Sequence, residues 1–156
     1  MRYRTADVGD HDGVVDLWMV LAEEMLAYGS RIDPPGSRPA VASHLGERLA
    51  DDRVIVADDE GSLVGLVVHA RRDDPLVRTA SVGVIEFLYV APTHRGRGIG
   101  SALLERAESV LAPEVDVVEL EVLEANEDAI AFYEAHDYRP DRRTVVKALE
   151  PDPESP

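Results

Sequence analysis

The order of short apolar segments along the chain constrains its fold more than any other feature. Apolar residues that alternate, or runs rich in valine and isoleucine, predict strands, and apolar residues three or four apart predict helices. Strands are expected at 2–6, 54–57, 63–70, 82–90, 117–122 and 144–149, and helices at 10–28, 41–50, 99–111 and 127–136, with a loop at 29–39. Strands joined by turns pair antiparallel, and strands joined through a helix can pair parallel. The pattern predicts an α/β layered domain with a mixed sheet.

The length of 156 residues suits one domain that buries its own core without a disulfide or a structural metal. We place that domain at residues 1–149 and interpret the acidic, proline-rich residues 150–156 as a tail. The chain has no cysteine, which excludes a thiol nucleophile and a cysteine-ligated zinc site. The five histidines lack metal-ligand spacing, so no metal is expected.

The charge is strongly acidic: 31 acidic against 16 basic side chains give a net charge of −15. Binding to nucleic acid is not expected, because phosphates repel such a surface. With no long apolar run and no signal-peptide pattern, we expect a cytoplasmic protein that does not span a membrane. Fifteen of the basic residues are arginine and only Lys147 is lysine, which favours adaptation to a salt-rich cytoplasm. A GC-rich genome is the competing explanation for the missing lysines.

The chemistry is concentrated in a glycine-rich segment between a predicted strand and a predicted helix. Gly96, Gly98 and Gly100 alternate with Arg95, Arg97, Ile99 and Ser101. Glycines let a backbone approach a ligand closely, and a helix start offers free N–H groups to a phosphate. A Walker A loop would need a lysine before Ser101, and a dinucleotide fingerprint would need wider glycine spacing. The segment therefore predicts a phosphate or diphosphate site of another class, with an empty glycine turn as the alternative.

Arg95, Gly98 and Gly100 resemble the acetyl-CoA motif of the GNAT acetyltransferases, in which an Arg or Gln precedes a Gly-x-Gly/Ala pair. A second resemblance lies in residues 126–134, where Asn126 opens a helix and Tyr133 follows seven residues later. The order of elements resembles the GNAT fold from Arg2 to about Leu149, with its mostly antiparallel mixed sheet flanked by helices. One departure is Asp137-Tyr138, where the family often has Gly-Phe.

The resemblance implies a role for each site residue. The main-chain N–H groups of residues 95–101 would bind the diphosphate of acetyl-CoA, and Val90 would pair with the pantetheine arm and polarise the thioester. Glu86 would act as general base toward an amine acceptor, with a solvent-facing or arginine-paired strand carboxylate as its alternative. Tyr133 would donate a proton to the leaving thiolate, or only a hydrogen bond that stabilises it, with a packed aromatic as its alternative. Asn126 would cap its helix, worth about 1 kcal/mol, and reach the pantetheine arm.

We therefore predict an acetyl-CoA-dependent N-acetyltransferase that transfers the acetyl group directly to an amine, either a small molecule or a protein amine. The alternatives are a non-catalytic acyl-CoA-binding or regulatory module on the same fold, and an interaction domain whose glycine loop is empty. Neither the acceptor nor the size of the acyl group is readable from the sequence. GNAT proteins often pair, so a homodimer is a further expectation.

Overall fold

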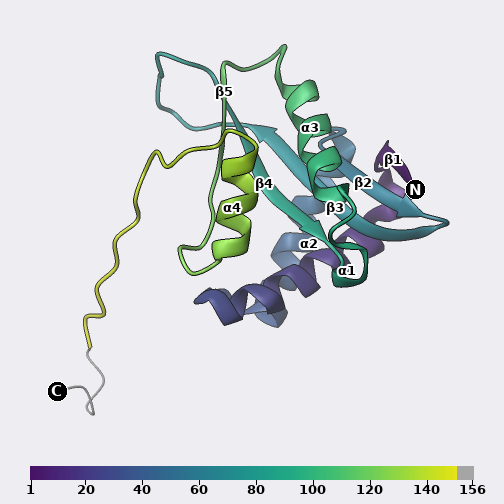
Figure 1. The fold of residues 1–156 in the computed structure, drawn as a ribbon, viewed down its shortest axis with the longest axis horizontal. Coiled ribbons are helices and arrows are strands. Elements are labelled where there is room, and N and C mark those ends of the chain that lie inside the picture. The colour runs from purple at the N-terminus through teal and green to yellow at the C-terminus, as the bar shows by residue number, and fades with distance from the viewer. Residues whose placement is uncertain (151–156) are drawn as a thin grey trace.

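The computed structural model describes residues 1–150, which form a five-stranded sheet with helices on both faces (Figure 1). The strands lie in chain order, and each neighbouring pair is antiparallel except the last, which is parallel. The strands are β1 (Arg2–Thr5), β2 (Val54–Asp59), β3 (Ser62–Arg71), β4 (Val82–Val90) and β5 (Val117–Leu120). The helices are α1 (His11–Met25), α2 (Pro34–Ala50), α3 (Ile99–Leu111) and α4 (Glu127–Ala135), with 3-10 turns η1 (Val8–Asp10), η2 (Leu26–Tyr28) and η3 (Pro92–His94). This mixed, mostly antiparallel sheet confirms the expected fold class.

The sheet separates two apolar cores. Helices α1 and α2 cover one face, where Val14, Trp18 and Leu45 are buried against β2 and β3. Helix α3 covers the other face with buried Leu103 and Leu104, and α4 packs at the edge of the same core. The sheet residues of β2 and β3 are buried on both faces, which explains their nearly continuous apolar sequence.

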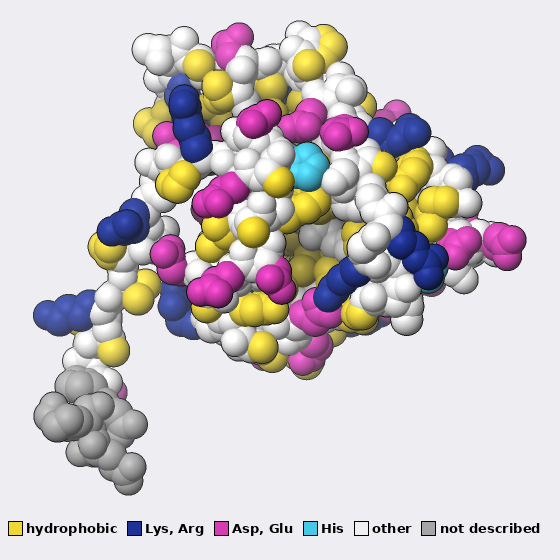
Figure 2. All heavy atoms as spheres, viewed as in Figure 1, with side chains coloured by type: hydrophobic (Ala, Val, Ile, Leu, Met, Phe, Trp, Pro, Cys, Tyr) yellow, Lys and Arg dark blue, Asp and Glu magenta, His cyan; other side chains and the backbone are white. Residues whose placement is uncertain are grey.

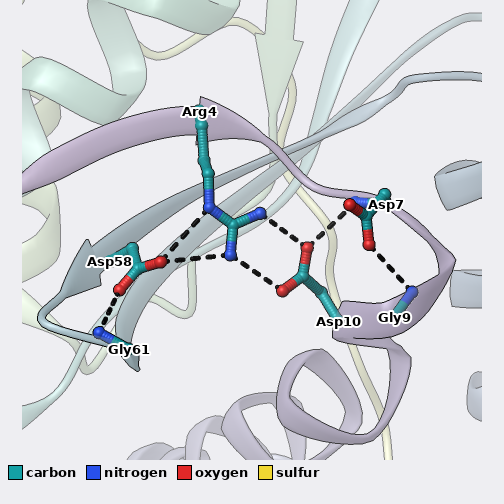
Figure 3. Close-up of polar contacts among 6 residues, drawn as sticks. All are labelled: Arg4, Asp7, Gly9, Asp10, Asp58 and Gly61. Carbon is teal, nitrogen blue, oxygen red and sulfur yellow. Dashed lines mark hydrogen bonds and ion pairs between the residues drawn. The ribbon is translucent and has the colours of Figure 1, made fainter.

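Strand β1 is held by a network around Arg4 (Figure 3). The guanidinium donates to Asp10 at 2.7 and 2.9 Å and to Asp58 at 3.2 Å, which joins β1 to the end of η1 and to β2. Asp7 and Asp10 form a capping box at η1. The hydrogen bonds from Arg4 hold the pKa of Asp10 below its usual range. A short edge strand is thereby fixed in register by charged groups.

The loop predicted at 29–39 is only partly a loop, because α2 begins at Pro34 instead of residue 41. Prolines 34 and 35 occupy the first helical positions, where their missing N–H groups cost nothing and their fixed φ favours the helix. Pro39 lies inside the helix, still near its start. The prediction was wrong there because proline and glycine were interpreted as turn formers instead of helix-initiating residues.

The prediction of a last strand at 144–149 was also wrong. Among residues 1–150 this segment pairs with no strand, and Val145, Val146 and Leu149 are 82%, 70% and 88% exposed. Strand propensity without a pairing partner does not make a strand. Strand β5 ends at Leu120, two residues before the predicted end. Of the predicted tail, residues 151–156 lie outside the described part of the chain.

No helix within residues 1–150 combines the length and the apolar character needed to cross a bilayer.

Candidate functional site

Strand β4 pairs with β5 over only part of its length. Parallel pairing joins Val82–Ile85 to Val117–Leu120, and β4 then continues to Val90 with no strand on that side within residues 1–150. The N–H of Ala91 donates to Val64 on β3 at 2.8 Å. Because successive N–H groups of a strand point to opposite edges, the N–H of Val90 points away from β3. The gap beside β4 therefore offers free main-chain groups to an extended ligand.

The glycine-rich loop lies at the end of this gap. Gly96 and Gly98 have φ of +77° and +78°, and a Cβ built on either would meet no atom within 4 Å. Gly98 stands at the N-cap of α3, and no side chain caps the helix there. The first N–H groups of a helix have no partner within the helix. The main-chain N–H groups of Ile99, Gly100 and Ser101 are therefore free to bind an anion, aided by the partial positive charge of the helix start.

The side chains of the loop have separate roles. Ile99 is buried in the α3 core, so only its main chain faces a ligand. A Cβ on Gly100 would stand 3.4 Å from Phe132 and 3.7 Å from Val90, which shows how closely α4 approaches the loop. Ser101 is half-buried in the first turn of α3.

Arg95 fixes the loop against α1. Its Nε donates to the carbonyl of Val90 at 2.9 Å, and its Nη2 contacts both carboxylate oxygens of Glu24 at 3.0 and 2.8 Å. The guanidinium also lies 5.3 Å from the ring centre of Tyr89, whose hydroxyl donates to Glu24 at 3.0 Å. Burial and the bond to Glu24 raise the pKa of Tyr89 to about 12. The charge of Arg95 is thus balanced locally.

Arg97 supplies the formal positive charge of the loop, since it is exposed and forms no ion pair within residues 1–150. Figure 2 shows basic side chains on the side of the molecule where the β4–α3 loop lies, while acidic side chains cover the neighbouring surface of α4. It also shows a hollow between α4 and this loop, with hydrophobic side chains on its floor. A locally positive rim on an acidic protein suits an anionic ligand.

Helix α4 borders the gap and comes close to the loop at Gly100. Asn126 is 9% exposed and caps α4, because its Oδ1 accepts from the N–H of Ala129 at 3.2 Å. The predicted capping role is confirmed. The amide Nδ2 lies 3.8 Å from the sulfur of Met25 on α1, so Asn126 joins α4 to α1 across the end of the gap.

Tyr133 packs edge-on between two aromatic rings, Phe132 at 5.3 Å and Tyr138 at 5.9 Å between ring centres. Burial raises the pKa of its hydroxyl to about 12. Within residues 1–150 the hydroxyl makes no hydrogen bond to a side chain or the main chain. It is therefore a neutral donor without a protein partner.

Glu86 is the extra residue of a β-bulge, since Val68 pairs with Phe87 and His69 with Ile85. Its carboxylate accepts from Arg48 Nε at 2.6 Å and Nη2 at 3.3 Å, and Oε1 lies 3.1 Å from His44 Nε2. Burial alone would raise the pKa of Glu86, but Arg48 and His44 outweigh it and hold the pKa below the ordinary value of 4.5. The arginine-paired strand carboxylate raised as an alternative is thus observed, and the group is ionised at neutral pH.

Sequence reasoning missed the partners of Glu86 and Arg95. His44 and Arg48 are four residues apart and so share one face of α2, a spacing that could have marked them as a pair facing the sheet. Glu24 carried no comparable signal, because it is one of 31 acidic residues and no spacing singles it out. Among residues 1–150, no group of three or more potential metal ligands comes together.

Comparison with known proteins agrees with this geometry. The model of the acetyltransferase (GNAT) family matches residues 18–138, a range that holds every candidate site residue. The chain belongs to the GNAT family. An N-acetyltransferase of Archaeoglobus fulgidus is 38% identical to this GNAT chain over 144 residues, covering 89% of the chain and 93% of that protein.

Solved structures share the GNAT fold of this chain. A protein from Bacillus halodurans is 27% identical with a TM-score of 0.78, covering 96% of this chain and all of that chain. A GCN5-related N-acetyltransferase from Ralstonia eutropha is 23% identical with a TM-score of 0.77, over 96% and 99% of the two chains. A protein of Clostridium acetobutylicum described as a predicted acetyltransferase and solved with acetyl-CoA is 19% identical with a TM-score of 0.72, over 95% and 96% of the two chains. Family and fold together support acetyl transfer.

Proposed function

We propose that this chain transfers an acetyl group from acetyl-CoA directly to an amine. The observation that carries the proposal is the open glycine loop at the uncapped start of α3. The loop follows β4, whose second half has no strand on the β5 side. Such a site combines anion binding with an extended main-chain edge, which suits a diphosphate followed by an amide-containing arm. The acetyl-CoA bound in the related fold from C. acetobutylicum supports this choice of ligand.

In this proposal the donor binds through the main chain. The N–H groups of residues 96–101 hold the diphosphate, with Arg97 adding charge, and Arg95 keeps the loop in place through Glu24 and Val90. When bound, acetyl-CoA supplies a thioester whose carbonyl carbon accepts the amine nitrogen. The N–H of Val90 points into the gap where it can polarise that carbonyl, and donors of this type elsewhere contribute about 3–4 kcal/mol.

Two side chains take part in the chemical step, Glu86 at the amine and Tyr133 at the thiolate. An amine with a pKa near 10 is mostly protonated at neutral pH, so its proton must leave before attack. The Glu86 carboxylate, shared with His44 at 3.1 Å, accepts that proton through water. Tyr133 donates a hydrogen bond to the departing thiolate. The chain has no cysteine to form an acyl-enzyme, which favours direct transfer.

A non-catalytic acyl-CoA-binding module is the second candidate, and one observation favours it. Arg48 holds the pKa of Glu86 below its usual range, which makes that carboxylate a weak base. The observation that favours catalysis is the position of Glu86 on the strand that borders the gap, with an imidazole 3.1 Å from its carboxylate.

Release of free thiol from acetyl-CoA, measured against a panel of amines, separates the two candidates. The absence of cysteine removes any protein background from this assay. We expect acceptor-dependent release with at least one amine class and none without acceptor. Tight CoA binding without release for any amine would instead favour the binding module, and no binding at millimolar CoA would exclude both.

A further inference from the structure

A hollow rich in arginine lies where the C-terminal end of α2 meets the end of β3, and we call it the arginine hollow. It has a volume of about 400 Å³, and its lining consists of Ala70 and six charged residues, Arg48, Arg53, Arg71, Arg72, Asp51 and Asp73. Four arginines against two aspartates give the lining an excess of two positive charges, on a chain whose net charge is −15. Such a local reversal of charge points to an anionic ligand.

Three of the arginines are held in place by carboxylates that lie outside the hollow. The pairs are Arg48–Glu86, Arg53–Glu114 and Arg72–Glu119. The three arginine side chains are 24%, 20% and 30% exposed, in that order. Because these guanidinium groups are already ordered, a ligand loses little affinity to fixing them.

The ion pairs leave donors of the guanidinium groups unused, because an arginine has more N–H groups than one carboxylate occupies. Within residues 1–150, Nη1 of Arg48, Nε of Arg53 and Nη1 of Arg72 make no hydrogen bond. Nε of Arg72 is buried without an acceptor, which is rare in folded proteins. Arg71 is exposed and forms no ion pair in the described part of the chain. The hollow thus combines fixed positive charge with free donors.

The lining favours a ligand that carries both acceptors and donors. The planar guanidinium matches the oxygens of a phosphate and can bind two of them at once. Ionised Asp51 and Asp73 can only accept hydrogen bonds, so the ligand must offer donors to them, as hydroxyl groups do. A phosphate monoester carries about 1.5 to 2 negative charges near neutral pH, which matches the charge excess of the lining.

The arginine hollow is separate from the glycine loop. In the pairing of β3 with β4, Arg71 lies opposite Gly83, whereas Gly65 lies opposite Val90 next to the loop. Seven strand residues separate Gly83 from Val90, a distance of roughly 23 Å at about 3.3 Å per residue. A diphosphate at the loop therefore leaves the hollow open.

We propose that the arginine hollow binds a small phosphate monoester that carries hydroxyl groups, and that Arg48 is shared between this ligand and Glu86. Arg48 donates to Glu86 through Nε and Nη2 at 2.6 and 3.3 Å, and it lines the hollow as well. A phosphate that binds the same guanidinium weakens its hold on the carboxylate, so the ligand and the Arg48–Glu86 ion pair oppose each other. The binding does not depend on the proposed acetyl transfer.

Calorimetric titration of the full chain with glycerol phosphate, at constant ionic strength, tests the site. Inorganic phosphate and glycerol, titrated separately, test the two halves of the ligand. R71Q removes the arginine that has no carboxylate partner, so this variant should fold like the wild type. R31Q is the matched control, since Arg31 is also exposed and without an ion pair in residues 1–150. It precedes the opposite end of α2, a helix of 17 residues and so about 25 Å long.

We expect glycerol phosphate to bind the wild type, inorganic phosphate to bind more weakly, and glycerol not to bind. R71Q should weaken the binding of glycerol phosphate about tenfold, as expected for one hydrogen bond to a charged group, and R31Q should change it little. E86Q should bind more tightly, because Arg48 then loses its competing carboxylate.

Three results would overturn the proposal: no binding to the wild type, equal affinities for R71Q and R31Q, or E86Q that binds no more tightly than the wild type. Binding that is lost in G98A or on addition of CoA would place the phosphate at the glycine loop and would overturn it as well.

Discussion

Replacing Tyr133 by phenylalanine tests how the thiolate is stabilised. Burial raises the pKa of Tyr133 to about 12, whereas a thiol has a pKa of about 8.5. Full proton transfer to the thiolate would then be uphill by about 5 kcal/mol, from roughly 3.5 pKa units at 1.36 kcal/mol each. The hydroxyl should therefore act by donating a hydrogen bond. Hydrogen bonds to charged groups contribute about 1.5–3 kcal/mol, so we expect Y133F to lower kcat by about 10- to 150-fold.

Stability should change little, because the contacts of the Tyr133 ring with Phe132 and Tyr138 do not involve the hydroxyl. Steady-state thiol release and a thermal melt measure the two effects separately. Y138F is the matched control. The hydroxyl of Tyr138 donates to Glu108 at 2.8 Å, so its removal should lower the melting temperature and leave kcat near the wild-type value. Equal kcat values for Y133F and wild type, or equal losses for Y133F and Y138F, would refute the role of Tyr133.

Three further predictions concern the loop, the carboxylate and the surface. G98A and G61A both place alanine at positive φ in open space, so each variant should lose about 1–2 kcal/mol of stability. Only G98A should weaken CoA binding, at least tenfold by calorimetry, because Gly61 lies outside the loop. E86Q should lower the rate at all pH values and destabilise the fold near pH 7. Because folding lowers the pKa of Glu86, the carboxylate stabilises the fold at pH values above its unfolded-state pKa of about 4.5. This stabilisation is lost as the pH falls through the pKa of Glu86 in the folded protein, so the melting temperatures of wild type and E86Q should converge in acid. If the acidic, lysine-poor composition reflects adaptation to salt, the melting temperature should be higher in molar salt, and equal values at low and high salt would refute that interpretation.

The glycine loop and the strands around it could be predicted because local signals agree there. Val82–Val90 is a strand whose residues are apolar except Gly83 and Glu86, and the alternating glycines allow few alternatives for the turn that follows. Asn126 was predictable as a cap for the same reason, since capping depends on residues three apart in sequence.

Interactions across long sequence distances could not be predicted. Glu86 meets Arg48 and His44 from 38 and 42 residues away, and Arg95 meets Glu24 from 71 residues away. The spacing of His44 and Arg48 marks a shared helix face but not the carboxylate that this face meets. No local pattern singles out Glu24 or Glu86 among 31 acidic side chains. The prediction of a strand at 144–149 was wrong for a related reason. A strand forms only where it can pair with the edge of a sheet, and the sequence of this segment does not show whether such an edge is within reach.

A crystal structure of the protein with CoA tests the central claim most directly. We expect the diphosphate oxygens to lie about 3 Å from main-chain nitrogens of residues 96–101, at the start of α3. The pantetheine arm should lie beside the second half of β4, along the edge that β5 leaves without a partner. A diphosphate bound anywhere else on the molecule would contradict that claim.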